Sequence, residues 1–86
     1  MMNNHAAHSL SGTPVDPHIG KRVRFFRTRG SLRQVVLATQ VGMSPVALSR
    51  LECGLQSVSA ERLAAIALAL AVTPNDLLGV SDDSHI

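Results

Sequence analysis

Aromatic side chains are scarce in this sequence of 86 residues: two are phenylalanine and none is tyrosine or tryptophan. Because aromatic residues are typical of strands, an aliphatic, alanine-rich chain favours helices over a β sandwich. Cysteine occurs once, at Cys53, which excludes an internal disulfide and fits a reducing compartment. Residues 1–14 carry no apolar signal core, and no apolar run approaches the roughly 20 residues of a membrane span. We therefore expect a cytoplasmic protein.

The composition suits one small folded domain. Hydrophobic residues make up 45% of the chain, which is enough for one modest core but not for a deep substrate cleft. Residues 1–15 are rich in Asn, His, Ser, Gly and Thr, and we expect a disordered arm there. Residues 16–80 form the predicted domain, and the acidic residues 81–86 are expected to be a flexible tail.

The charges are distributed unevenly, although the net charge is only +2. After Glu52 the only base is Arg62, and acids outnumber it. One short segment without any acid holds six bases, namely Lys21, Arg22, Arg24, Arg27, Arg29 and Arg33. Such a segment is suited to the phosphates of a nucleic acid, but it is also compatible with a solvated basic helix.

Start and stop signals predict five helices, which makes the fold class all-α. Asp16-Pro17 begins the first helix, because an acidic cap is followed by proline at the first helical position. Gly30 ends this helix. Ser31 begins the second helix, with Gln34 three residues later at the spacing of a capping box.

The other three helices also begin at polar caps. Ser44-Pro45 begins the third helix, and Gly54 ends it. Ser59 caps the fourth helix, and Thr73-Pro74 begins a short fifth helix. Aliphatic residues recur at helical spacing, so each helix can turn one apolar stripe toward a shared core. The predicted architecture is a compact five-helix domain without strands.

The second and third helices form a helix-turn-helix from about Gln34 to Cys53. Gly42 can adopt the left-handed conformation that reverses the chain after a helix. Ala38 is small enough to let the third helix approach the second closely. The third helix, Pro45 to Cys53, then protrudes and has a size that enters a major groove about 12 Å wide. We call it the recognition helix.

Short motifs over most of the folded part resemble the phage repressor/Cro-type helix-turn-helix family, also called the XRE family. The resemblance implies a five-helix domain that binds operator DNA as a dimer. The motifs that carry it are Ile19-Gly20-Lys21-Arg22-Val23-Arg24 with Arg27, Leu32-Arg33-Gln34 with Leu37-Ala38, Val41-Gly42-Met43-Ser44, Leu48-Ser49-Arg50-Leu51-Glu52 with Gly54, Ser59 with Glu61 and Leu63, Ile66-Ala67, Ala69-Leu70-Ala71-Val72, and Leu77-Leu78.

The resemblance also implies roles for single residues. It gives phosphate contacts to Gln34 and Ser44, although Gln34 can equally be only a capping residue. From the basic segment we add Arg33 and Lys21 as phosphate contacts. Further residues are implied in two groups: the base-facing positions Pro45, Val46, Ser49 and Arg50, and a structural ion pair between Arg27 and Glu52.

The front of the recognition helix departs from the family pattern. Pro45, Val46 and Ala47 are apolar or poor hydrogen bonders where relatives commonly carry Gln, Ser or Thr. Direct readout therefore rests mainly on Arg50, which can read guanine or clamp a phosphate, and specificity is expected to lean on DNA shape. Cys53 is expected to be a small, semi-buried residue rather than a redox switch.

The fourth helix has a second apolar face beside its inner stripe. A helix that is apolar nearly all round is usually buried on both sides, and here the second side would be covered by another subunit. An alanine-rich helix selected for helix propensity is the alternative. The predicted dimer interface consists of Leu68, Ala64, Val72 and Leu77.

Other kinds of site are not supported. His5 and His8 have helical spacing for a metal but lie in the predicted arm without a cysteine or acid cluster. No catalytic set or glycine-rich phosphate loop is recognisable, so we expect no enzyme activity, cofactor or small-molecule ligand. The sequence predicts a homodimeric, sequence-specific transcriptional regulator of repressor, controller or antitoxin type, with a palindromic operator. A protein–protein interaction module with the same fold is the alternative.

Overall fold

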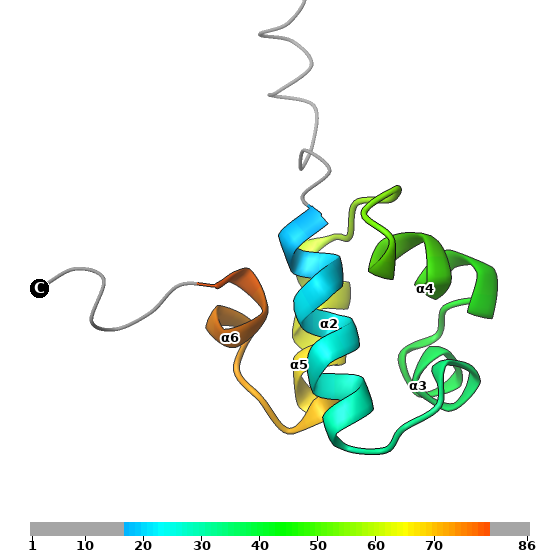
Figure 1. The fold of residues 1–86 in the computed structure, drawn as a ribbon, viewed down its shortest axis with the longest axis horizontal. Helices are drawn as coiled ribbons and strands as arrows, with labels where there is room; N and C mark the ends of the chain where they lie inside the picture. The colour runs from blue at the N-terminus through cyan, green and yellow to red at the C-terminus, as the bar shows by residue number, and fades with distance from the viewer. Residues whose placement is uncertain (1–16, 80–86) are drawn as a thin grey trace, which may run out of the picture.

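The computed structural model describes residues 17–79, and these residues form five α-helices and no strand (Figure 1). The predicted all-α fold is thereby confirmed. The predicted arm (1–15), the cap at Asp16 and the tail (81–86) lie outside the described residues. The helices are α2 (Pro17–Arg29), α3 (Gln34–Val41), α4 (Pro45–Glu52), α5 (Ala60–Leu70) and α6 (Pro74–Leu78).

Helix α2 is the centre of the arrangement. It packs against α4, α5 and α6, while α3 packs against α4 and α5, and α5 against α6. Figure 1 shows α6 on one side of α2 and the pair α3 and α4 on the other. Among the described helices, none is long and apolar enough to cross a membrane.

The core between the helices is aliphatic, as the near absence of aromatic residues requires. Phe26 only packs at its edge, and Phe25 is half exposed against it. Every described helix contributes at least one side chain, so the core holds all five together. The largest fully buried side chains are Val23, Leu37, Leu48, Leu51, Ile66 and Leu77.

Two small residues, Ala38 and Gly20, allow close packing of the helices. Ala38 is completely buried where α3 meets its neighbours, consistent with the predicted close approach. Gly20 lies on α2 where that helix crosses α4, and a Cβ built on Gly20 would collide with the carbonyl oxygen of Leu51. The sequence pattern did not assign this packing role to Gly20.

The predicted caps of the last three helices are confirmed. Ser44 and Ser59 each accept a hydrogen bond through Oγ from the backbone N–H three residues later, at 3.0 and 3.1 Å. Thr73 forms a reciprocal capping box with Asp76, whose carboxylate accepts from the Thr73 N–H at 2.9 Å. These local bonds satisfy backbone donors that the first turn of a helix leaves unpaired.

The predicted start of the second helix at Ser31 is wrong. Ser31 has a φ of 58° and belongs to the turn that closes α2, where its N–H donates to the Thr28 carbonyl and the Leu32 N–H donates to the Arg27 carbonyl. Helix α3 begins later, at Gln34, and no side chain caps it. The chain reversal after Gly30 therefore uses the serine that the capping-box spacing had assigned to α3.

Candidate nucleic-acid interface

Helices α3 and α4 are joined by a turn of three residues, Gly42, Met43 and Ser44. Gly42 has the predicted left-handed conformation, with φ 72° and ψ 30°. The Met43 N–H donates to the Ala38 carbonyl at 2.9 Å and the Gly42 N–H to the Thr39 carbonyl at 3.3 Å, which closes α3. Ser44 then caps α4, so both helix ends in the turn have backbone or hydroxyl partners.

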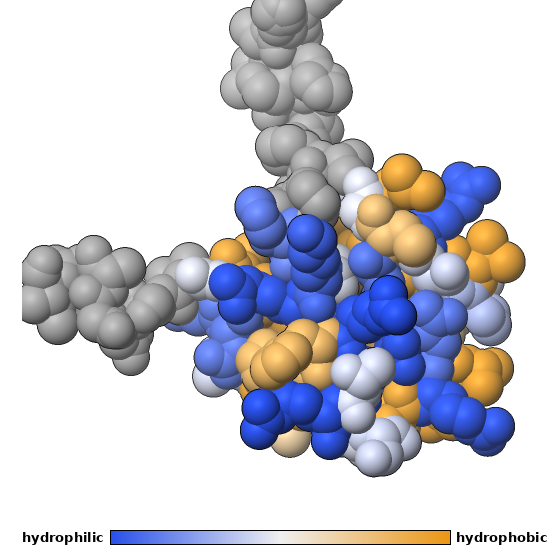
Figure 2. Space-filling model, viewed as in Figure 1, coloured by the Kyte–Doolittle hydropathy of each residue, from blue (hydrophilic) through white to orange (hydrophobic). Residues whose placement is uncertain are grey.

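The outward face of α4 carries the residues predicted to face bases. Val46 is 65% exposed, Pro45 and Arg50 are exposed, and Ser49 is half-buried, whereas the other face fills the core. The Arg50 guanidinium makes no hydrogen bond or ion pair with any other residue between 17 and 79. Figure 2 shows hydrophobic patches at the edge where α3 and α4 lie, in agreement with the apolar front expected for this helix. The helix itself ends at Glu52, and Cys53 is its C-cap.

Glu52 is the centre of a buried polar network at the end of α4. It is 6% exposed and receives two hydrogen bonds from Arg27, with Nε to Oε2 at 2.6 Å and Nη2 to Oε1 at 2.9 Å. Arg27 also donates to the Leu32 carbonyl at 2.8 Å. The pair implied by the resemblance is therefore present in bidentate form, the geometry in which such pairs are strongest.

Gln34 completes this network through a bond that the sequence pattern did not predict. Its Nε2 donates to Glu52 Oε1 at 2.9 Å from the first residue of α3. Three helices are thus tied to one carboxylate: α2 through Arg27, α3 through Gln34 and α4 through Glu52 itself. The capping role considered for Gln34 is not found, because no side-chain cap exists at the start of α3.

A shallow pocket of about 420 Å³ adjoins this network, and we call it the basic pocket. Three of its lining residues are arginines, and its single acid, Glu52, is already paired with Arg27. Such a surface attracts anions because its positive charge exceeds its negative charge. The lining residues are Arg24, Arg27, Arg33, Gln34, Ser49, Glu52 and Cys53. Cys53 is exposed there, so the expectation of a semi-buried cysteine is wrong.

Comparison with known proteins identifies this arrangement. The sequence profile described as a helix-turn-helix domain matches residues 18–83. The chain belongs to the helix-turn-helix domain family. The predicted family is thereby confirmed. Similar proteins also support the predicted class, a DNA-binding transcriptional regulator.

Three proteins similar to this helix-turn-helix chain are described as regulator or controller proteins. An uncharacterised transcriptional regulator in the ATPase CF(0) region of Rhodospirillum rubrum is 47% identical over 58 residues, which are 67% of this chain and 54% of that protein. The chain thus spans about half the length of this curated relative. The clp gene regulator ClgR of Corynebacterium glutamicum has a TM-score of 0.72 at 32% identity, over 83% of this chain and 79% of the other. The restriction-modification controller protein C.AhdI of Aeromonas hydrophila has a TM-score of 0.67 at 32% identity, over 70% of this chain and 91% of the other.

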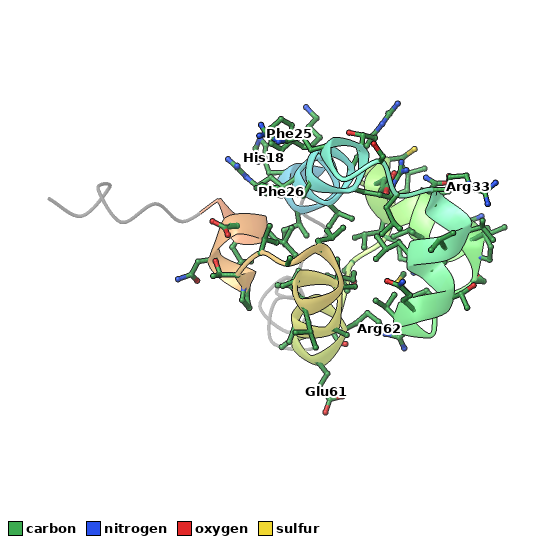
Figure 3. All side chains as sticks on the ribbon, turned by 90° about the horizontal axis from the view of Figure 1, so that it is seen from below. His18, Phe25, Phe26, Arg33, Glu61 and Arg62 are labelled. Carbon is green, nitrogen blue, oxygen red and sulfur yellow. The ribbon has the colours of Figure 1, made fainter. Side chains whose placement is uncertain are left out.

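The basic residues of α2 are divided between two flanks of the helix-turn-helix domain. Arg24 lines the basic pocket beside α4, and Lys21 is exposed one turn before it. Arg29 instead lies over the Phe25 ring, 5.3 Å from its centroid. Figure 3 shows Phe25 projecting from α2 away from α3 and α4. Only part of the basic segment therefore faces the recognition-helix side.

The four residues predicted for a dimer interface do not share one surface. Leu68 is 82% exposed, and Ala64, one turn earlier on α5, is also exposed. Val72 is half-buried and packs against the core. Leu77 is completely buried, because α6 folds back onto α2 and α5, so its place in the predicted interface is wrong.

Arg62 is a further residue whose position the sequence did not reveal. It lies on α5, and its Nη1 donates to the carbonyls of Val41 at 2.8 Å and Gly42 at 2.7 Å. Figure 3 shows Arg62 extending toward the α3 side, whereas Glu61 points away from the domain. The only signal in the sequence was that Arg62 is the lone base after Glu52.

Proposed function

We propose that the protein is a DNA-binding transcriptional regulator that inserts α4 into the major groove of duplex DNA. One observation carries this proposal: the exposed face of α4 lies next to the basic pocket and carries Arg50, whose guanidinium has no partner among residues 17–79. A short protruding helix supplies contacts to base edges, while flanking positive charge supplies affinity for phosphates. The helix-turn-helix family and the regulator relatives support the same class.

Phosphate contacts are assigned to Gln34, Ser44, Arg33 and Lys21. The amide nitrogen of Gln34 has two hydrogens, and its bond to Glu52 uses one of them, so the other can reach a phosphate. The Ser44 hydroxyl accepts from the Ala47 N–H and retains its own hydrogen for donation. Arg33 contributes charge to the basic pocket, and Lys21 extends it along α2.

Base contacts are assigned to Arg50, Ser49, Val46 and Pro45. Arg50 has the length and the paired donors to read guanine. Val46 is exposed enough to contact the methyl group of thymine, and the Ser49 hydroxyl can bond to several bases. Because only two of the four side chains can donate hydrogen bonds, we expect DNA shape to supply part of the specificity.

We further propose a homodimer that binds a palindromic operator through two copies of α4. Leu68 is the most exposed large hydrophobic residue of the described part, and Ala64 next to it leaves room for a partner helix. A two-fold symmetric dimer places identical helices in successive major grooves, so its site is palindromic. On this reading the protein is a repressor or controller and carries out no catalysis.

One observation favours a second function, a protein–protein interaction module. Val46 and Pro45 are exposed at the start of α4, and Leu55 is a large exposed hydrophobic residue in the loop after the helix. A helix-turn-helix that had lost DNA binding would use such a surface for another protein. Arg50 and the basic pocket have no purpose under this alternative, so we prefer DNA.

The test is fluorescence anisotropy with a random-sequence duplex across a range of salt concentrations. Binding through several phosphates weakens steeply and linearly in the logarithm of salt. Binding that is absent or insensitive to salt would exclude DNA and leave the interaction module. Selection from a randomised DNA pool then identifies the preferred sequence, and two inverted half-sites in it would support the dimer.

A further inference from the structure

The end of α3 has an unusual arrangement of hydrogen-bond partners. The last four carbonyls of a helix have no partner within the helix. The Ala38 and Thr39 carbonyls receive the N–H groups of Met43 and Gly42, as is usual for a helix that ends in glycine. The Val41 and Gly42 carbonyls instead receive both their hydrogen bonds from one nitrogen of Arg62.

This contact reaches the turn from a distant part of the chain. Arg62 lies in the first turn of α5, 21 residues after Val41. Its positive charge also meets the negative end of the α3 dipole, which adds to the attraction. Since α5 is anchored in the core by Leu63 and Ile66, Arg62 connects the turn to a rigid part of the domain.

On this side the turn lies at the edge of a pocket, and the bonds from Arg62 connect it to α5. A pocket of about 320 Å³ separates the turn from the loop between α4 and α5, and Arg62 is one of the residues that line it. Ser44 and Ala47, from the first turn of α4, line the same pocket. The far end of α4 is held differently, by the network around Glu52.

We propose that Arg62 is a positioning residue that fixes the first turn of α4 for sequence-specific DNA binding. Arg62 holds the two carbonyls that immediately precede Met43 and Ser44, so it sets where Pro45 and Val46 enter the groove. One arginine, Arg62, thus holds the turn that precedes α4, and another, Arg27, holds Glu52 at the far end of α4. The inference rests on the proposed function, because the orientation of α4 matters only if α4 reads DNA.

A different use of Arg62 makes a different prediction. Its Nε and Nη2 atoms donate to no other residue between 17 and 79, so they are available for a DNA phosphate. If Arg62 contacts a phosphate directly, its replacement should weaken binding to all sequences equally and lower the salt dependence by about one charge. If Arg62 is a positioning residue, its replacement should lower the preference for the selected sequence and leave the salt dependence unchanged.

The experiment compares three variants of the full chain. Arg62→Met removes the donors but keeps a similar stem, Arg62→Lys keeps a donor that can reach a carbonyl, and Arg29→Met is the control for the loss of one positive charge. Anisotropy gives the Kd for the selected duplex and for a random duplex of equal length, each across salt. Amide hydrogen exchange at Met43 reports on the turn without DNA.

We expect Arg62→Met to lose about tenfold affinity for the selected duplex relative to Arg29→Met, with equal affinities for the random duplex. Exchange at Met43 should accelerate in Arg62→Met, and Arg62→Lys should recover most of both losses. Equal losses on both duplexes with a lower salt dependence would overturn the proposal in favour of a phosphate contact. Unchanged exchange at Met43 would overturn it regardless of DNA.

The two measurements also separate failure of this inference from failure of the proposed function. If the wild-type protein binds no DNA, the proposed function fails, and the positioning role fails with it even when exchange at Met43 responds to Arg62. If the wild-type protein selects a sequence that Arg62→Met binds equally well, only the inference fails. Circular dichroism of each variant establishes that the helices are retained.

Discussion

Gly20 on α2 lies against the carbonyl oxygen of Leu51 on α4, with no room for a side chain between them. The backbones of α2 and α4 are therefore in direct contact here, and α4 is the helix that we propose to enter DNA. A carbonyl oxygen within a helix cannot rotate away as the end of a long side chain can. The separation of α2 and α4 is consequently fixed by the absence of one methyl group.

Replacing Gly20 with alanine is expected to lower the free energy of unfolding by about 1–3 kcal/mol, the usual cost of overpacking. Chemical denaturation followed by circular dichroism measures the change. Gly30→Ala is the matched control, since the nearest atom to a Cβ there is 3.6 Å away, an ordinary contact. Equal stability of the two variants would contradict the packing role of Gly20.

Removing one partner of the ion pair between Arg27 and Glu52 is expected to lower stability much more than removing both. Arg27→Met leaves the Glu52 carboxylate buried without its main partner, and we expect a loss of about 3–5 kcal/mol. The double variant Arg27→Met/Glu52→Leu removes both charges and should recover most of that loss. Denaturant unfolding compares them, with Arg29→Met as the surface control. A single variant no less stable than this control would show that the pair contributes little.

Arg50 and Arg33 are expected to differ in the kind of DNA binding that they support. Arg50→Ala should cost about 1–3 kcal/mol on the selected duplex and relax the sequence preference, because a base contact is lost. Arg33→Ala should weaken all duplexes alike and lower the salt dependence by about one charge. Competition binding across salt measures both. An unchanged site preference in Arg50→Ala would remove Arg50 from base readout.

Leu68→Lys tests the proposed dimer. Leu68 is exposed, so the change should leave the unfolding midpoint nearly unaltered while placing two like charges in the interface. Analytical ultracentrifugation is expected to give a dimer for the wild type and a monomer for the variant. Leu55→Lys, at an exposed leucine outside α5, serves as the control and should remain dimeric. A dimer that persists in Leu68→Lys would place the interface elsewhere.

The features that the sequence predicted well are local ones. Ser44, Ser59 and Thr73 cap their helices through residues only three positions away, so a short window contains both partners. Gly42 is recognisable for the same reason, since its conformation depends on the turn itself. Ser31 shows the limit of this logic, because the same spacing is found where a serine closes the preceding helix instead.

The features that the sequence left unpredicted depend on tertiary distance. The bonds of Arg62 to Val41 and of Gln34 to Glu52 join residues far apart in the chain, and no periodicity encodes them. Leu77 was misplaced for a related reason. An apolar residue on a five-residue helix can face the core or a partner, and only the fold of α6 against α2 and α5 decides between them.

The way α4 is attached has a consequence for changing the DNA preference of this protein. Its fixed points are the buried Leu48 and Leu51, the carboxylate of Glu52 and the turn before Ser44. The side chains of Val46 and Arg50, in contrast, form no hydrogen bond or ion pair with any residue between 17 and 79. Side chains at these two outward positions can therefore be exchanged with little effect on folding. The domain is a scaffold on which libraries varied at a few surface positions should yield regulators directed to new sequences.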